Sequence, residues 1–414
     1  MASVGSVWRR LLGVEGVVVE EWTFDDLEEA FVVSVRLPKK LRRRCSLCQR
    51  RCPREDRGDG RRCWRGLDLG TTRVLLSAES PRVRCPAHGV VVQAVPWARP
   101  HSGFTREFED QCAWLAVHTN RTAVSTLMRV AWRTIGRMLR TVGDEARGKV
   151  DLLANLTRIG IDELSYKKGH KYVIVVIDHV TGRLVWMGPG RDGETLGRFF
   201  DALGAERSAA LELVTADGAE WIESVVAKRA PQAIRCLDPF HIVQWATKAL
   251  DEVRRDKWNE LRDAGDGKQS KALKDARWAL WKNPGTLTAG QTKSLAWIAD
   301  SNRDLYRSYL LKEGLRTIFA LPEATARERL EEWLKWAPRC RIPAFVALGR
   351  TIRKYRDRIE ASITHGMSNA IVEAKNTQLR LMLRQAFGFH DVGAFIGLAM
   401  LKLGNLCPPL PGRA

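Results

Sequence analysis

The sequence lacks any long run of uncharged apolar residues, and it contains no amphipathic anchor with a separate tail. Since a membrane-spanning helix needs roughly 20 consecutive apolar residues, neither a spanning segment nor a membrane anchor is expected. The start, 1–12, carries Arg9 and Arg10 but not the apolar core of a secretory signal. We therefore expect a cytoplasmic protein. In that compartment, nine cysteines are interpreted as thiols or metal ligands rather than disulfides.

Acidic residues are scarce relative to basic ones. The chain of 414 residues has 48 Asp and Glu against 68 Lys and Arg, a net charge of +20. This surplus favours nucleic acid as the partner, with an inert basic surface as the alternative. The length predicts two or three domains, and 45% hydrophobic residues exclude disorder of the whole chain. We find no internal repeat.

The front of the chain combines short strands with its most cationic stretch. Strands are predicted at 17–22 and 31–36, joined by an acidic connection. Between Lys39 and Arg65, twelve basic and three acidic residues are interleaved with four cysteines. Prolines and glycines in this stretch favour a compact knuckle or loop over a long helix.

Two pairs of metal-binding residues stand about forty positions apart. One pair is Cys45 and Cys48, and the other is Cys85 and His88. Three thiolates and an imidazole suit the closed tetrahedral site that structural zinc prefers. The segment between the pairs would then fold as a ribbon. An alternative ligand set remains open: Cys45, Cys48, Cys52 and Cys63.

The pattern becomes helical beyond Trp97. A helix is predicted over 104–118, followed by shorter helical segments at 122–128 and 131–136. Their polar start and close spacing are typical of a helix-turn-helix, with an ordinary three-helix linker as the alternative. In a helix-turn-helix, the recognition helix would be Ala131 to Leu139.

After Asp151, strands and helices alternate. The predicted strands are 158–163, 172–177, 184–187, 211–215 and 233–237, and helices are predicted at 194–203 and 219–228. The first three strands have short connections, which predicts an antiparallel meander. Three strands followed by helix, strand, helix and strand is the order of a ribonuclease-H-like fold. From Phe240 onward the sequence is helical, with breaks near Gly265, Pro284, Pro322 and Pro338, and we interpret this region as a helical insertion.

Two acids follow apolar strands. Asp162 ends the first predicted strand, and Asp217 follows the fourth, which in the ribonuclease-H order is adjacent to the first. Neighbouring carboxylates repel unless cations separate them. A pair of Mg²⁺ ions about 4 Å apart would do so while aligning a phosphodiester for in-line attack. Asp178, which closes the second strand, is interpreted as structural.

A third acid is expected from the segment Ser368–Asn376, a helix opened by a Ser/Asn cap. On that helix Asn369, Glu373 and Asn376 lie along one face, with Arg380 one turn further. A polar stripe of this kind suits a metal site. A solvated helix face is the alternative that spacing alone would favour.

Several further segments carry a family pattern. They are Ile161–Glu163, Lys168–Tyr172, Thr215–Ala219, Asp238–His241, Ala249–Asp251 with Arg254 and Arg255, and the Ser368–Asn376 helix leading into Gly388 and Phe389. With the Cys45/Cys48 and Cys85/His88 pairs, they make the sequence resemble the insertion-sequence DDE transposases of the ISL-three family over nearly its whole length. One departure is His88, where many relatives carry a fourth cysteine.

The resemblance implies an α/β protein: a ribonuclease-H-like mixed sheet with a helical insertion, preceded by a small zinc-binding domain and a helix-turn-helix. The catalytic acids would be Asp162, Asp217 and Glu373, the last two separated by 373 − 217 = 156 residues. They would hold two Mg²⁺ or Mn²⁺ ions, and Zn²⁺ would be structural. The expected domains are 1–100 (zinc), 101–150 (helix-turn-helix), 151–262 (core, first part), 263–350 (insertion) and 351–414 (core, last part).

The implied activity is that of a DNA transposase, which binds the terminal inverted repeats of an insertion sequence and catalyses two-metal-ion strand cleavage and strand transfer. Contacts with DNA are expected from arginines in the knuckle and the helix-turn-helix: Arg42, Arg43, Arg44, Arg129, Arg133 and Arg137. Asp238, His241 and Asn376 would assist the acids from around the site. The expected partners are the repeats, target double-stranded DNA and a second copy, in a homodimer or larger synaptic complex at the nucleoid.

Two rival functions remain open from the sequence. One is a zinc-containing helix-turn-helix regulator without catalysis, which would leave the three acids unexplained. The other is a structure-selective nuclease on the same fold, which would hydrolyse DNA without strand transfer.

Overall fold

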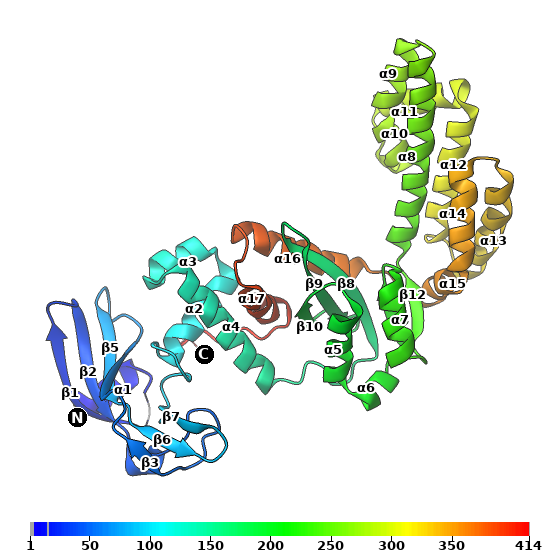
Figure 1. Ribbon diagram of the computed structural model, residues 1–414. Helices are drawn as coiled ribbons and strands as arrows, with labels where there is room; N and C mark the ends of the chain where they lie inside the picture. Colours follow the sequence, from blue (N-terminus) through cyan, green and yellow to red (C-terminus); the bar gives the residue numbers. More distant parts are fainter. Residues whose placement is uncertain (1–3, 15, 414) are drawn as a thin grey trace. The chain divides into compact units, whose positions relative to one another are not determined.

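The computed structural model describes residues 4–14 and 16–413 (Figure 1). The chain forms two compact units. The first comprises Met1–Asp151 and Leu383–Ala414, and the second comprises Leu152–Met382. The sequence-based division kept 351–414 together, whereas the structure divides this stretch, because its last helix packs on the helices of the first unit.

A four-stranded sheet forms the front of the first unit. Its order is β1-β2-β5-β4, and its strands are β1 (Val18–Asp25), β2 (Ala30–Arg36), β4 (Arg61–Arg65) and β5 (Arg73–Glu79), with helix α1 (Val4–Leu11) beside β1. The two strands predicted at the front are confirmed as β1 and β2, which pair antiparallel. Trp64 and Trp97 lie in the core of this sheet with edge-to-face rings.

A second, smaller sheet holds the cysteine-rich segment. It follows the short helix η1 (Lys39–Leu41), and its order is β3-β6-β7, with β3 (Arg54–Asp56), β6 (Arg82–Cys85) and β7 (Gly89–Val92). The ribbon expected between the two ligand pairs is present as β4 and β5, an antiparallel pair in which Trp64 lies opposite Leu76. The chain leaves the small sheet after β3, contributes β4 and β5 to the larger sheet, and returns at β6.

Four helices complete the first unit: α2 (Arg106–His118), α3 (Arg121–Met128), α4 (Trp132–Lys149) and α17 (Val392–Leu403). The side chain of Asn120 caps α3 by accepting from the backbone N–H of Ala123, and α3 ends at Arg129 in a left-handed conformation. α17 crosses α4 closely, since a Cβ added at Gly397 would lie 2.3 Å from the carbonyl oxygen of Leu139. Only glycine permits that approach.

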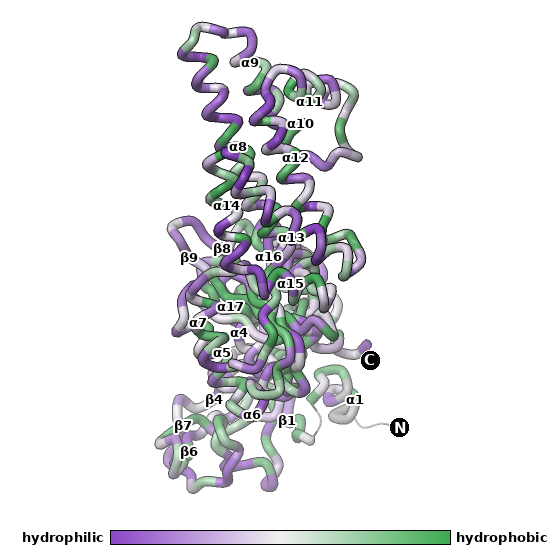
Figure 2. Tube along the Cα trace, turned by 90° about the vertical axis from the view of Figure 1, so that its right-hand side faces the viewer, coloured by the Kyte–Doolittle hydropathy of each residue, from purple (hydrophilic) through white to green (hydrophobic). Residues whose placement is uncertain are grey.

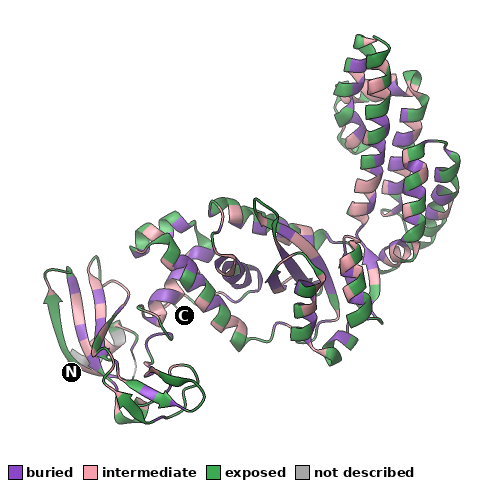
Figure 3. Ribbon diagram, in the orientation of Figure 1, coloured by how far each residue is buried: buried purple, intermediate pink, exposed green. Residues whose placement is uncertain are grey.

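The second unit is built on a five-stranded sheet of order β10-β9-β8-β11-β12 (Figure 1). Its strands are β8 (Arg158–Lys167), β9 (Lys171–Asp178), β10 (Leu184–Pro189), β11 (Leu213–Ala216) and β12 (Ile234–Leu237). The predicted meander is confirmed, because β9 pairs antiparallel with both β8 and β10, while β11 is parallel to β8 and to β12. Figure 3 shows buried residues along the strands of this sheet.

Helices accompany this sheet in the predicted order. They are α5 (Gly193–Leu203) and α7 (Glu220–Arg229), with a short α6 (Ala205–Ala209) between them that the sequence did not predict. β8 also differs from the prediction. It continues to Lys167, so Asp162 lies within the strand instead of ending it, because β9 pairs with β8 as far as Lys167.

A helical region follows β12 and has its own apolar core. Its elements are α8 (Pro239–Asp263), α9 (Gly267–Asp275), α10 (Arg277–Trp281), η2 (Pro284–Thr286), α11 (Ala289–Ser301), α12 (Arg303–Ile318), α13 (Glu323–Arg339), α14 (Pro343–Lys354) and α15 (Arg356–His365). Figure 2 shows polar and apolar residues alternating along α8. The predicted break at Pro338 falls inside the last turn of α13, one residue before that helix ends.

The last helix of the second unit is α16 (Ala370–Gln385), which extends beyond the unit boundary at Met382. It begins at the predicted Ser368/Asn369 cap, where Glu373 donates its backbone N–H to the carbonyl of Asn369. Across residues 4–14 and 16–413, none of the helices is both long and apolar enough to traverse a bilayer.

Candidate active site and metal centre

Three acids stand in register on three adjacent parallel strands. β11 pairs with β8 as far as Thr215 opposite Gly160, and continuing that register by two residues sets Asp217 opposite Asp162. β12 pairs with β11 as far as Leu237 opposite Ala216, so the next positions are Asp238 and Asp217. Since neighbouring strands lie about 4.8 Å apart, the three acids lie side by side, Asp162 within β8 and the other two just beyond the ends of β11 and β12.

Burial and a neighbouring acid together change the protonation of Asp162. Burial raises the pKa of the Asp162 carboxyl to about 6, and the negative charge of Asp217 adds to the rise. The backbone N–H of Glu163, 2.7 Å from Oδ1 of Asp162, acts in the opposite direction. A buried carboxyl held beside another acid is the arrangement expected where a cation would later compensate the charge.

Helix α16 is seated directly on these strands. Val372 packs on Gly160, where an added Cβ would lie 2.3 Å from the Val372 Cγ2 atom. One turn further along α16, Asn376 donates from Nδ2 to Oδ2 of Asp162 at 2.6 Å. The step from Gly160 to Asp162 on β8 thus matches the turn from Val372 to Asn376 on α16. These two contacts align the helix along the strand.

The start of α16 is fixed to the other two strands. Asn369 accepts from the Thr215 hydroxyl of β11 and donates its backbone N–H to Oδ1 of Asp238 at 3.1 Å. Thr215 is also hydrogen-bonded to Nε2 of His179 at 2.7 Å. The side chains in these three contacts are buried or half-buried. The contacts therefore hold the start of the helix in place.

Glu373 is half-buried on α16, in the turn between Asn369 and Asn376. Burial raises the pKa of its carboxyl, and the charge of Asp238 adds to the effect. Among residues 4–14 and 16–413, Glu373, Asp162 and Asp217 do not form a group of three side chains placed to hold a single metal ion. A two-ion site about 4 Å across needs ligands spread more widely than one ion's coordination shell.

Asp238 and His241 lie beside these acids. Asp238 is 2% exposed and pairs with Nδ1 of His241 at 3.1 Å. That hydrogen bond raises the pKa of His241 despite burial, and the charges of Asp217 and Asp162 contribute in the same direction. Asp238 also caps α8 through the backbone N–H of Phe240.

Asp178 has the structural role that was predicted for it. Its carboxylate accepts from the backbone N–H groups of Val180 and Thr181 and from the Thr181 hydroxyl, which closes the turn between β9 and β10.

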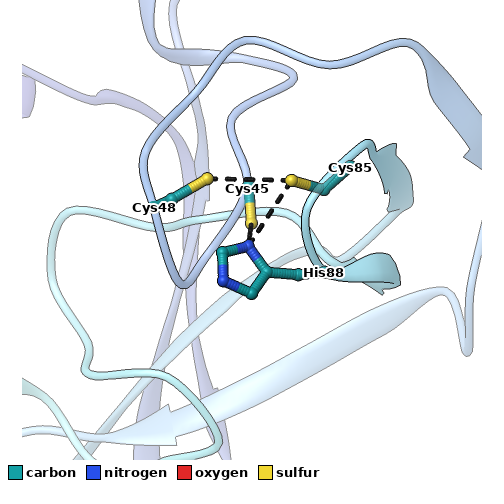
Figure 4. A group of neighbouring side chains, drawn as sticks. All are labelled: Cys45, Cys48, Cys85 and His88. Carbon is teal, nitrogen blue, oxygen red and sulfur yellow. Dashed lines mark hydrogen bonds between the residues drawn. The ribbon is translucent and has the colours of Figure 1, made fainter.

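The two ligand pairs of the small sheet come together in one cluster (Figure 4). The ligand atoms of Cys45, Cys48, Cys85 and His88 all lie within 4.8 Å of one another. Cys45 and Cys48 stand on a tight loop, whereas Cys85 and His88 stand at the hairpin between β6 and β7, which turns at Gly89 with φ of 68°.

Distances within this cluster are regular. Cys48 and Cys85 have their sulfurs 3.7 Å apart, and Nδ1 of His88 lies 3.7 Å from the sulfur of Cys45 and 3.5 Å from that of Cys85. Burial would raise the pKa of Cys85, but hydrogen bonds from His88 and nearby backbone lower it to about 6. A thiol of this kind readily supplies the thiolate that metals bind.

The alternative ligand set is not assembled. Cys63 lies on β4 in the larger sheet, pairing with Ser77 of β5. Cys52 is buried near the cluster, with its sulfur directed to the carbonyl of Arg50 at 3.3 Å. In residues 4–14 and 16–413, no group of three or more metal-binding side chains includes either cysteine.

The arginines expected to contact DNA lie in different surroundings. Arg42 donates to the backbone carbonyl of Leu37 and Arg44 to that of Gln49, and Arg43 is exposed. Arg133 and Arg137 are exposed on α4. The guanidinium of Arg129, in contrast, is bound to Asp68 and to the carbonyl of Thr71.

Sequence reasoning missed Gly160, Thr215 and His179. Each is uninformative alone, since a glycine in a strand and a buried threonine have many uses. The signal available was Gly160 interrupting an apolar strand two residues before Asp162, which indicates a close approach of another backbone or helix.

Two family models match this chain, one over the catalytic unit and one over the helices α2 to α4. A family model described as "Transposase", for DDE transposases of the ISL3 type, matches residues 159–398, and one described as "Helix-turn-helix domain of transposase family ISL3" matches residues 93–143. The chain is 48% identical over 431 aligned positions to the transposase for insertion sequence element IS1557 of Mycobacterium tuberculosis, strains CDC 1551 and H37Rv. That alignment covers 98% of this chain and 97% of the relative. The transposase for insertion sequence element IS1001 of Bordetella parapertussis is 28% identical, with 84% and 85% covered.

The class of protein is therefore a DNA transposase with a helix-turn-helix DNA-binding domain and a DDE catalytic domain. The chain belongs to the ISL3 transposase family. The helix-turn-helix prediction is confirmed, with α3 and α4 as its two helices, although α4 continues ten residues beyond the predicted end at Leu139.

Proposed function

We propose that this transposase cuts the ends of its insertion sequence and joins the freed 3′ ends to target DNA, using Asp162, Asp217 and Glu373 as ligands of two divalent cations, Mg²⁺ or Mn²⁺. The supporting observation is the register that sets Asp217, just beyond the end of β11, opposite Asp162 within β8. Helix α16, seated on the same strands, adds Glu373.

We infer that the core is ribonuclease-H-like. The support is its strand order, β10-β9-β8-β11-β12, in which β9 alone runs opposite to the other strands. The helical region between β12 and α16 would then be the insertion of that core.

The donor set suits hard divalent cations. Carboxylate and amide oxygens are the ligands that Mg²⁺ prefers. Oδ1 of Asn376 is buried beside Asp162 and has no hydrogen-bond partner within the described residues, so it offers a further oxygen. When bound in pairs, such cations activate the attacking hydroxyl and stabilise the leaving oxygen of a phosphodiester.

The surrounding residues hold the acids in place. Asp162 accepts from Asn376 on one oxygen and from the backbone of Glu163 on the other, so its carboxylate plane is fixed. Asp238 orients His241, and a protonated His241 would offset part of the charge of Asp162 and Asp217. We assign Asn376, Asp238 and His241 as positioning residues.

We further propose that Cys45, Cys48, Cys85 and His88 hold a structural Zn²⁺ ion. Bonds of about 2.3 Å to sulfur and about 2.0 to 2.1 Å to nitrogen, at tetrahedral angles, put sulfurs about 3.8 Å apart and sulfur about 3.6 Å from nitrogen. The distances of 3.7, 3.7 and 3.5 Å fit these values. Four protein ligands leave no open position, which favours a structural over a catalytic role.

The first unit would bind the terminal inverted repeats. The knuckle arginines Arg42, Arg43 and Arg44 would contact phosphates, and the exposed Arg133 and Arg137 would serve α4 as recognition helix. A contact from Arg129, which the sequence also suggested, would require its pair with Asp68 to break. Joining two element ends in one reaction favours a homodimer or larger synaptic complex, working at the nucleoid.

A strand-transfer assay with a precut element end and Mg²⁺ tests this proposal. We expect the labelled end to become covalently joined to target DNA. A regulator would bind the end without joining it, and a nuclease would hydrolyse DNA without joining it. Either of those two results would overturn the proposed function.

A further inference from the structure

A pocket of about 790 Å³ lies within the first unit, between the first half of α4 and the segment Ala386–Asp391 that joins α16 to α17. Pockets of this size accommodate small ligands. The segment contains Gly388 and Phe389, which the family pattern marked and which the proposed catalysis leaves without a role.

Arg121 supplies a buried cation to this pocket. It is 8% exposed, and its guanidinium lies 5.7 Å from the ring centre of Trp132 and 4.8 Å from that of Phe389. Nη2 donates to the carbonyl of Trp132, whereas Nε is buried without a partner in the described structure. Buried charges are normally paired, and burial lowers the pKa of this group.

Two further cations line the same pocket. Arg133 and Arg137 lie one turn apart on the exposed face of α4. Across residues 4–14 and 16–413, neither these two nor Arg121 forms an ion pair with a carboxylate, whereas Arg140 is paired with Asp391. The pocket therefore concentrates positive charge that the protein itself does not neutralise.

Phe387 adds an exposed aromatic ring. It is 86% exposed, and its φ of 49° lies in the left-handed region that bulky residues rarely adopt. The turn that holds it is well defined, because Phe387 and Gly388 donate their backbone N–H groups to the carbonyls of Arg384 and Leu383. Trp132, at the start of α4, provides a second ring that is 38% exposed.

We propose that this pocket binds one unpaired nucleotide of a DNA strand. Guanidinium groups match phosphate geometry, so Arg121, Arg133 and Arg137 hold the phosphate. The rings of Phe387 and Trp132 stack on the base, an interaction that every base can make. The inference rests on the proposed function, because it assumes that the first unit engages DNA, and it adds recognition of an unpaired strand to that of the duplex.

The test compares two labelled DNAs by fluorescence anisotropy with the full-length, zinc-loaded protein. One is a blunt duplex, and the other is the same duplex with a short single-stranded oligothymidine extension. We expect the extension to increase the affinity of the unaltered protein about tenfold, the scale of one stacked base. Phe387→Ala and Arg121→Met should each remove that gain while blunt-duplex affinity changes by less than about twofold.

Matched controls separate the pocket from general effects. Phe24→Ala removes an exposed ring from β1, and Arg147→Gln removes a cation from the far end of α4, so both should keep the gain. Because Arg121 is buried, the unfolding temperature of its variant should be measured alongside DNA binding to show that the variant is folded. The variant of the exposed Phe387 is expected to fold normally. A gain that persists in both pocket variants would overturn the inference.

Competition identifies the ligand. A thymidine trinucleotide should displace the extension at a concentration at least about tenfold below that of inorganic phosphate. Equal potency would mean a bare anion site and would overturn the assignment of a nucleotide. An unaltered protein that binds the blunt duplex without any gain from the extension would refute this inference alone, whereas one that binds neither DNA would refute the proposed function.

Discussion

Asn376 of α16 donates a hydrogen bond to Asp162 of β8 at 2.6 Å, across 214 positions of sequence. The contact joins an acid of the sheet to the helix that carries Glu373, and the whole helical region lies between them in the chain. Because Asn376 is 1% exposed, the bond is shielded from water and is expected to be stronger than a surface contact. This amide, together with the contacts of Asn369 and Val372 with the sheet, therefore sets the position of Glu373 relative to Asp162.

Asn376→Ala should weaken metal binding more than it weakens folding. Loss of a group that orients a metal ligand typically costs about 10- to 100-fold in metal affinity. We expect the Mg²⁺ concentration for half-maximal strand cleavage to rise by that factor, with cleavage largely restored at high Mg²⁺. Thr377→Ala, at the exposed neighbouring position, is the control. An unchanged Mg²⁺ midpoint with a lower maximal rate would contradict the positioning role.

Glu373→Gln should abolish cleavage and leave binding of DNA ends intact. The substitution removes a metal-binding charge at nearly constant shape, and the loss of several kcal/mol of transition-state stabilisation corresponds to about 1,000-fold or more in rate. Glu163→Gln is a demanding control, since Glu163 adjoins Asp162 but is paired with Arg191 at 2.6 Å. Cleavage that survives in Glu373→Gln, or disappears equally in Glu163→Gln, would remove Glu373 as the third acid.

Gly160→Ala should displace α16 from the sheet. An added methyl group would meet Val372 at 2.3 Å and His179 at 2.9 Å, and such overpacking costs about 1 to 3 kcal/mol of unfolding free energy. The double variant with Val372→Ala should lose less than the sum of the two single changes, because the methyl then finds space. Gly285→Ala, which meets nothing within 4 Å, is the control. Strict additivity in denaturant unfolding would argue against this contact.

The strands of the core could be predicted because their signal is local. Apolar runs bounded by turn residues recur between Arg158 and Leu237, and each predicted strand appears within a few residues of its place. The extent of β8 could not be predicted, since residues 164–167 are polar enough to resemble a loop and are held in the strand by pairing with β9. The sequence also predicted that Asn369, Glu373 and Asn376 share one face of α16. It could not predict which of them contact the sheet, because those contacts join segments far apart in the chain.

The proposed metal ligands of the small sheet were predictable from spacing alone up to a choice between two sets. What excluded Cys63 is a long-range pairing, because β4 joins β5 in the larger sheet and carries Cys63 away from the knuckle. One local feature distinguishes the two cysteines, since Cys85 has His88 three positions later, whereas Cys63 has no second ligand at that spacing. The pairing of β4 with β5 determines that Cys63 is not part of the cluster.

Removal of zinc should unfold the small sheet. The cluster links a loop before β3 to the β6–β7 hairpin, and a small core of Cys45, Cys52, Val83 and Cys85 provides little other stabilisation. We expect Cys85→Ser to lose bound zinc, as measured by metal analysis, and to lower the unfolding temperature. His88→Cys should retain one zinc per chain, because four thiolates also form a tetrahedral site. Cys63→Ser should change neither quantity, and zinc loss from it would contradict the ligand assignment.

The response of the protein to Mg²⁺ should depend on pH in a specific direction. The pKa of Asp162 is raised from 3.8 to about 6 in the folded protein, mainly by burial and then by Asp217. Between these two values the folded state binds more protons than the unfolded state, so stability in Mg²⁺-free buffer falls as pH rises through this window, by about 2 to 3 kcal/mol. Above pH 6 Asp162 is ionised beside Asp217, and only the partial charge of His241 opposes their repulsion in Mg²⁺-free buffer.

Mg²⁺ should reverse that loss, because cation binding favours the ionised form and must displace a proton below about pH 6. We expect the increase in unfolding temperature on adding Mg²⁺ to be small at acidic pH and to grow through pH 6 to a plateau. Asp217→Asn removes the repelling charge, so its Mg²⁺-free stability should decline less over the same range, and Mg²⁺ should then stabilise it less. An increase from Mg²⁺ that does not vary with pH in the unaltered protein would mean that the ion binds away from Asp162.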